Sequence, residues 1–236
     1  ALGLFADAGI SATFFVLGWI AERHPAMIRR IAASGHEIAS HGYAHAKVTS
    51  QTMDEFREDI SRAKLILEDI SGQEVKGYRA PSFSIGAGNL EALDVLADTG
   101  HRYSSSIYPI SHDHYGMPAA PRFAYRHGGD GILEIPMSTV NIFGRNFPCG
   151  GGGWFRFAPY QYFRWALRRL NEIEDQSAIF YFHPWELDPN QPRVKQVSLK
   201  ARFRHYVNLG RMERNLARLL SDFRWDRMDR VFLDRD

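Results

Sequence analysis

Short apolar runs alternate with longer segments of helical spacing along the 236-residue chain. The runs are rich in β-branched and aromatic residues, which predicts strands. They lie around residues 11–17, 36–40, 75–81, 102–106, 131–137 and 177–183. The segments with apolar residues three or four positions apart predict helices. These segments lie at residues 21–35, 52–72, 89–100, 159–174 and around 211–220.

The segment 52–72 carries the clearest helix signals. Thr52 and Glu55 have the spacing of a capping box, and Gly72 is placed to end the helix. Its expected buried face consists of Phe56, Ile60, Ala63 and Ile66. The first nine residues resemble the end of another amphipathic helix, so we expect the chain to start inside a domain.

Strands that alternate with helices of ten or more residues predict parallel βαβ units. A barrel and a doubly wound sheet both fit this pattern, and in both the functional residues lie just past the C-terminal ends of the strands. Three polar residues lie at or just after a predicted strand, namely His41, Arg79 and His183. These residues are therefore the first candidates for a functional site.

Charge and composition limit the classes of function. The chain has 29 basic and 27 acidic residues, which gives a net charge of +2. This nearly equal balance argues against a nucleic-acid-binding surface. The single cysteine, Cys149, excludes an internal disulfide and a multi-cysteine zinc site. The chain has no run of eighteen apolar residues, so we expect no membrane-spanning segment.

His41 and His45 lie four positions apart, in the sequence IASHGYAH. This spacing puts two side chains on one face of a helical turn, where both imidazoles could bind one metal ion. The alternative is that the two rings line a loop without a metal. A zinc site needs at least one more ligand, usually histidine or a carboxylate, which this motif does not supply.

The other two candidates each allow two interpretations. His183 ends an apolar run and precedes Pro184 and Trp185, so it is either a structural histidine or a half-enclosed general acid. Arg79 either positions a carboxylate or anchors a loop.

The glycine-rich stretch 149–157 lacks the lysine and hydroxyl residue of a phosphate-binding loop. A loop that carries aromatic residues to the substrate is the better interpretation.

Four segments together resemble the polysaccharide deacetylases, the NodB-like family-four carbohydrate esterases. The segments are ATFFVLG, SGHEIASHGYAH, GYRAPSFSI and AIFYFHPWE, and they occur in the family's order between residues 12 and 186. The later sequence FRHYVNL further resembles a subgroup found in bacterial exopolysaccharide gene clusters. The resemblance implies a distorted (β/α) barrel of the NodB type. It also implies a catalytic domain over residues 1–198 and a family extension over residues 199–236.

The resemblance also implies roles for single residues. His41 and His45 would bind one divalent metal, most commonly zinc. Arg79 would orient the catalytic base, and His183 would protonate the leaving amine. Three further residues would shape the sugar site, namely Trp185, Tyr43 and Pro81. The implied reaction removes N-acetyl groups from the amino sugars of a polysaccharide.

Two departures from the family pattern modify these expectations. The family's first motif supplies the catalytic base and a third, acidic metal ligand, and we expect it on a first strand that precedes Ala1. We therefore expect this chain alone to be inactive, and a non-catalytic glycan-binding module is the alternative function. Ser104 stands where the subgroup usually has an aspartate. A bacterial cytoplasmic and a periplasmic location are both compatible with the sequence, as is any oligomeric state.

Overall fold

The structure is a computed structural model that describes residues 1–113, 115–194 and 198–234. The chain divides into two compact units. The first unit combines Ala1–Ile10 with Ser138–Trp225, and the second combines Ser11–Met137 with the residues from 226 onward. The boundary expected at residue 198 stays a prediction.

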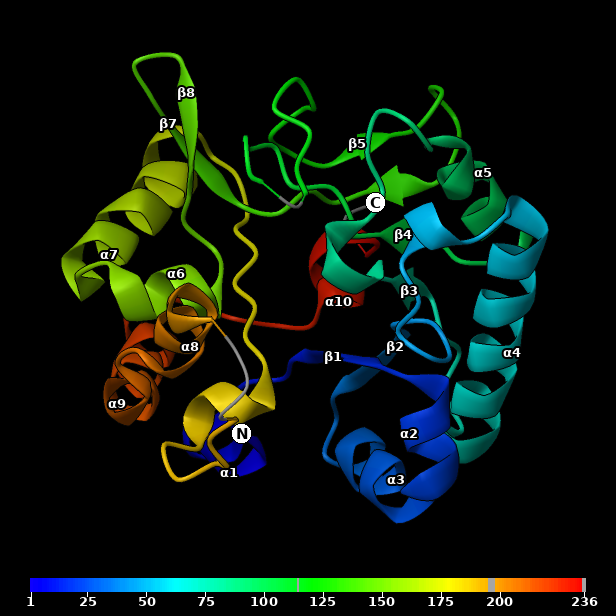
Figure 1. Cartoon of the computed structure of the whole chain (residues 1–236), viewed down its shortest axis with the longest axis horizontal. Helices are drawn as coiled ribbons and strands as arrows, with labels where there is room; N and C mark the ends of the chain where they lie inside the picture. The colour runs from blue at the N-terminus through cyan, green and yellow to red at the C-terminus, as the bar shows by residue number, and fades with distance from the viewer. Residues whose placement is uncertain (114, 195–197, 235–236) are drawn as a thin grey trace. The chain divides into compact units, whose positions relative to one another are not determined.

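The second unit contains a six-stranded sheet with the order β1-β2-β3-β4-β6-β5 (Figure 1). Each pair from β1 to β6 in that order is parallel, and β5 alone pairs antiparallel. The strands are β1 (Thr13–Val16), β2 (Glu37–Ser40), β3 (Gly77–Tyr78), β4 (Tyr103–Ser104), β5 (Tyr125–Arg126) and β6 (Leu133–Glu134). Five of the six predicted strands are confirmed in this sheet, as is the parallel βαβ arrangement.

Helices connect β1 to β2, β2 to β3 and β3 to β4 in the second unit. They are α2 (Gly18–Arg23), α3 (Pro25–Ala33), α4 (Met53–Ser71) and α5 (Glu91–Asp98), with the short 3₁₀ turns η1 (Val48–Ser50) and η2 (Pro81–Phe83). A final helix, α10 (Met228–Phe232), returns to the sheet. The backbone N–H of Met228 donates to the Thr13 hydroxyl at 2.8 Å, which ties α10 to β1.

Helix α4 forms as its sequence predicts. The Thr52 side chain accepts from the Glu55 backbone and the Glu55 carboxylate accepts from the Thr52 backbone, which completes the capping box. Gly72 ends the helix in the left-handed conformation, with φ of 66°. One expected core position is wrong. Leu67 is buried in place of Ile66, because Leu67 lies one full turn after the buried Ala63.

The first unit contains mostly helices and one hairpin (Figure 1). The hairpin pairs β7 (Thr139–Ile142) with β8 (Arg145–Pro148). The helices are α1 (Leu2–Asp7), α6 (Gly152–Phe157), α7 (Tyr160–Arg168), α8 (Leu199–Tyr206) and α9 (Leu209–Asp222). A π-helical turn, η3 (Arg169–Ile173), continues α7, and a 3₁₀ turn, η4 (Pro184–Leu187), follows His183. The helices predicted at 159–174 and around 211–220 are thereby confirmed.

The strand predicted at residues 177–183 is wrong as a regular strand. Only Tyr181 pairs, in an isolated parallel bridge with Gly151. The Ile179 N–H donates to the Ser138 side chain at 2.6 Å instead of to a neighbouring strand. A strand needs a continuous ladder of backbone partners, and a side-chain acceptor interrupts it.

No helix in the described part of the chain is long and apolar enough to cross a membrane.

His101 makes the stability of the second unit depend on pH. Its ring is buried, 4% exposed, and lies edge-on to Tyr78 with 5.9 Å between ring centroids. Burial, helped by the charge of Lys64, lowers the pKa of His101 from 6.5 to about 4. A lowered histidine pKa stabilises the fold above pH 6.5, and this stabilisation is lost as the pH falls toward 4. The free energy of unfolding that is lost over this pH range is about 3 kcal/mol.

We therefore expect His101→Gln to lose less stability than the wild type between pH 7.5 and pH 4.5. Urea denaturation at both pH values measures the two losses. His24→Gln, at an exposed histidine, serves as the control and should follow the wild type. Equal losses in the wild type and His101→Gln would show that His101 does not set this pH dependence.

Candidate functional site

His41 and His45 lie together at the C-terminal end of β2. Their ring centroids are 5.1 Å apart, and the rings meet at 72°. The chain between them is not helical, which corrects the expectation of a helical turn. Gly42 and His45 both have positive φ, at 77° and 62°, so a left-handed turn brings the rings together. Left-handed backbone is uncommon for a residue other than glycine, and such strained positions cluster at functional sites.

The first turn of this loop requires glycine at position 42. A Cβ atom there would lie 2.6 Å from the Asp59 carboxylate of α4. The same carboxylate accepts from the backbone N–H of Tyr43 at 2.9 Å. The close approach to α4 therefore fixes the path of the loop that carries both histidines.

The backbone of Arg79 orients the His41 ring. The Arg79 carbonyl oxygen lies 2.6 Å from His41 Nδ1. A carbonyl only accepts, so Nδ1 carries the proton and the lone pair lies on Nε2. Metal-binding histidines commonly have this arrangement, in which a carbonyl fixes the tautomer and the ring orientation. The contact therefore fixes the tautomer and the orientation of the His41 ring, and metal binding by this ring stays a prediction.

The Arg79 side chain is buried and anchored. Its Nε donates to the Ser105 carbonyl at 2.9 Å, and Nη2 donates to the Ser105 hydroxyl at 2.8 Å. The guanidinium also lies 4.1 Å from the centre of the Phe15 ring. Arg79 thus links the loop after β4 to the histidine site after β2. Its role toward a catalytic base stays a prediction.

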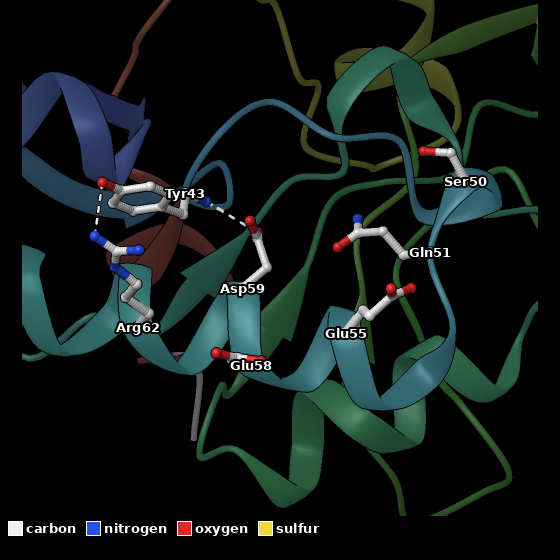
Figure 2. A pocket seen from close by; sticks show the side chains of 7 residues that line it. All are labelled: Tyr43, Ser50, Gln51, Glu55, Glu58, Asp59 and Arg62. Carbon is white, nitrogen blue, oxygen red and sulfur yellow. Dashed lines mark hydrogen bonds between the residues drawn. The ribbon is translucent and has the colours of Figure 1, made fainter.

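The two expected sugar contacts of the second unit pack against protein. The Tyr43 hydroxyl donates to Glu22 and accepts from Arg62, each at 2.7 Å, and the Arg62 guanidinium covers its ring at 3.6 Å. Figure 2 shows this pairing beside α4. Pro81 is buried at the start of η2. Whether either residue contacts a sugar stays a prediction.

An acidic pocket of about 340 Å³ lies beside Tyr43, on α4 and the loop before it (Figure 2). Its lining residues are Tyr43, Ser50, Gln51, Glu55, Glu58, Asp59 and Arg62. Neither His41 nor His45 lines it, so this pocket is not the predicted metal site. Within the described residues, no group of three or more His, Cys, Asp or Glu side chains could hold a metal ion. His41 and His45 are therefore two candidate ligands and do not form a complete site among these residues.

His183, in the first unit, has a carboxylate partner that the sequence reasoning missed. Glu186 Oε2 accepts from the His183 backbone N–H at 2.8 Å and lies 3.6 Å from its Nδ1. Burial alone would raise the pKa of Glu186, but the hydrogen bonds from His183 and the charge of Arg156 hold it below its ordinary value. Glu186 is therefore ionised near neutral pH and places a negative charge beside His183.

Trp185 completes the surroundings of His183. The two rings stack with 5.7 Å between centroids and 19° between planes. The His183 side chain remains 56% exposed, so its ring is open to solvent. Trp185 also stacks on His205, with 4.1 Å between ring centroids. The structure thus groups His183 with Trp185 and Glu186 in one unit, and His41 with His45 and Arg79 in the other.

Comparison with known proteins identifies the family. A family model described as polysaccharide deacetylase matches residues 1–104, and one described as domain of unknown function (DUF3473) matches residues 105–233. Residues 1–104 belong to the polysaccharide deacetylase family, and residues 105–233 belong to the family of the second model. The second model covers more than half of the chain, beyond the part that the deacetylase model matches.

Two curated relatives and one solved structure show the extent of the similarity. A peptidoglycan-N-acetylglucosamine deacetylase from Bacillus cereus is 39% identical over 72 residues, which are 30% of this chain and 26% of the relative. A chitooligosaccharide deacetylase from Rhizobium leguminosarum bv. trifolii is 29% identical over 143 residues, 59% of this chain and 58% of the relative. The chain therefore spans between a quarter and three fifths of these relatives.

The solved structure is that of a putative polysaccharide deacetylase from Mycobacterium smegmatis. It is 24% identical, with a TM-score of 0.58, and the match covers 93% of this chain and 69% of that one. At this identity the likeness shows the fold. It confirms the predicted NodB-like α/β class of the deacetylases.

Ser104 is fully buried, and a carboxylate lies on the neighbouring strand. Ser104 pairs with Glu134 across the β4–β6 ladder. Glu134 Oε1 accepts from the backbone N–H groups of Ser106 and Ile107, both at 2.9 Å. Burial raises the pKa of Glu134, while these hydrogen bonds and the charge of Arg79 oppose the rise. The sequence signal was an acidic residue inside an apolar run, in GILEIPM.

Glu134 also stabilises the turn that holds Arg79, which gives a second prediction. Glu134→Ala leaves two buried N–H groups without an acceptor, at about 1–3 kcal/mol each. We expect a loss of about 2–5 kcal/mol for Glu134→Ala and a smaller loss for Glu134→Gln, which keeps an acceptor oxygen. Urea denaturation compares the two variants. Equal losses would mean that the backbone hydrogen bonds to Glu134 contribute little.

Proposed function

We propose that this protein is a metal-dependent hydrolase that removes N-acetyl groups from the amino sugars of a polysaccharide. The observation that carries the proposal is the pair His41 and His45, held at the C-terminal end of a parallel strand with the His41 tautomer fixed by Arg79. The printed names of the two relatives, deacetylases of peptidoglycan N-acetylglucosamine and of chitooligosaccharide, support it. The proposed glycan class is thus a chain of N-acetylated amino sugars.

The donor set fits a zinc ion. Neutral imidazole is the commonest nitrogen ligand for zinc, and the Arg79 carbonyl holds His41 in the tautomer that presents Nε2. His41 and His45 would bind the ion as two of its ligands. A bound zinc ion polarises an amide carbonyl and lowers the pKa of a water molecule. The family's acidic third ligand and base remain unassigned in this chain.

His183 would supply the proton that amide cleavage needs. An amide nitrogen leaves only when it is protonated, because an amide anion is too basic to leave. The exposed His183 ring is available to a substrate, and the Glu186 carboxylate lies 3.6 Å from its Nδ1. Trp185 limits the motion of the ring by stacking on it. Arg79 would orient the catalytic base, as the family resemblance implies.

The resemblance of residues 203–209 to the exopolysaccharide subgroup extends the proposal to a role in exopolysaccharide synthesis. In this view the substrate is an exopolysaccharide under synthesis. The chemistry at the site is the same for any N-acetylated glycan, so a panel of glycans is the appropriate test.

Acetate release from N-acetylated glycans tests the function. We expect the zinc-loaded protein at its full natural length to release acetate from chitooligosaccharide, peptidoglycan or an acetylated exopolysaccharide, and a chelator to stop the release. Glycan binding without zinc binding and without acetate release would instead establish the non-catalytic glycan-binding module.

A further inference from the structure

Helix α8 presents its apolar residues to solvent. None of its residues is buried. Leu199 is 84% exposed and Phe203 is 61% exposed, and their spacing of four places them on one face of the helix. The half-exposed ring of Phe157 lies edge-on to Phe203, with 5.7 Å between centroids, and extends this strip. An exposed apolar strip of this kind marks an interaction surface.

Basic residues flank the apolar strip. Lys200 and Arg202 lie on either side of Leu199 and Phe203 around the helix, and Arg204 follows. All three are exposed. The sequence contains no acidic residue between Asp188 and Glu213. The surface therefore combines apolar side chains with a cluster of positively charged ones.

The helix is held firmly by its C-terminal end. Buried Arg156 donates to the carbonyl oxygens of His205 and Val207, at 2.9 and 2.8 Å. The opposite side of the helix carries His205, which stacks on Trp185. These contacts fix the direction in which Leu199 and Phe203 point, without burying either of them. The location of α8 is shown in Figure 1.

We propose that α8 binds the surface of an anionic phospholipid bilayer. Leu199, Phe203 and Phe157 would enter the boundary between head groups and acyl chains. Lys200 and Arg202 would reach the lipid phosphates, since long basic side chains keep their charge at the interface while their stems cover apolar surface. A soluble polyanion would satisfy the charges but leave the apolar strip in water, so the bilayer is the better partner. This inference does not depend on the proposed deacetylase activity.

Vesicle co-sedimentation tests the proposal. The protein should bind vesicles of phosphatidylglycerol and phosphatidylethanolamine more tightly than vesicles of phosphatidylcholine, and salt should weaken the binding. We expect Phe203→Ser to weaken binding by about tenfold or more, and Arg202→Gln to weaken it by a few-fold. The matched control is Leu65→Ser, at a residue of α4 that is 68% exposed, and it should bind as the wild type does.

Three results would overturn the proposal. The first is equal binding to anionic and phosphatidylcholine vesicles. The second is an equal loss in Phe203→Ser and Leu65→Ser. The third is binding to heparin, a soluble polyanion, as tight as that to anionic vesicles and unaffected by Phe203→Ser. Circular dichroism of each variant confirms that the fold is kept, which the exposure of all the substituted residues favours.

Discussion

Arg156→Ala is expected to lower the free energy of unfolding by about 3–5 kcal/mol, because it removes the positively charged partner of a buried carboxylate. Arg156 and Glu186 form an ion pair of 2.9 Å, with side chains 3% and 1% exposed. The same guanidinium donates to the backbone carbonyls of His205 and Val207. The substitution therefore removes the arginine partner of the Glu186 carboxylate and of two partly buried carbonyl oxygens together. Urea denaturation at pH 7 measures the loss.

The pH dependence of the stability loss in Arg156→Ala gives a second test of this prediction. The pKa of Glu186 is lowered in the folded protein, so its stabilisation is present at neutral pH and is lost as the pH falls through the folded pKa. Arg156→Ala should therefore differ least from the wild type in acid. Arg57→Ala is the control, since Arg57 and Asp98 form an exposed pair of 2.8 Å. Its cost should stay within about 1 kcal/mol. Equal losses of unfolding free energy in Arg156→Ala and Arg57→Ala would contradict the claim that burial strengthens the Arg156–Glu186 pair.

His183→Ala is expected to reduce kcat by about 10²–10⁴-fold, the usual contribution of a positioned general acid. The affinity for zinc should not change, because His183 is not among the proposed ligands. Steady-state acetate release measures kcat, and calorimetric titration measures the zinc affinity. The loss should be in kcat with little change in KM, since the proton is transferred only during the reaction.

His24→Ala is the matched control for His183→Ala. His24 is also exposed but lies at the start of α3 in the second unit. This variant should retain the activity of the wild type. Full activity of His183→Ala, or loss of zinc binding in that variant, would contradict the role of His183 as the proton donor.

The sequence predicted the parts of the fold that depend on local pattern. The capping box of α4 and the five strands of the parallel sheet follow from side-chain spacing and β-propensity, which act within a few residues. The hairpin of β7 and β8 was not predicted. Its turn at Phe143 and Gly144 has positive φ at both residues, and a phenylalanine does not signal such a turn.

The sequence indicated candidate residues for the site but not their geometry. The spacing of His41 and His45 suggested a helix, whereas the contact of Gly42 with α4 produces a left-handed turn. That contact joins residues far apart in the sequence. The same limit applies to Glu134, which meets Ser106 only because β4 and β6 pair. Glu186 had a local signal, since it follows His183 by three residues as in a capping box.

Zinc titration by isothermal calorimetry tests the central claim, that His41 and His45 bind one metal ion. The wild-type protein is predicted to bind one zinc ion, and His41→Ala and His45→Ala are each predicted to lose about a hundredfold or more in affinity. His24→Ala should bind zinc as the wild type does. A wild-type protein with no saturable zinc binding, or one whose binding survives both substitutions, would contradict the account.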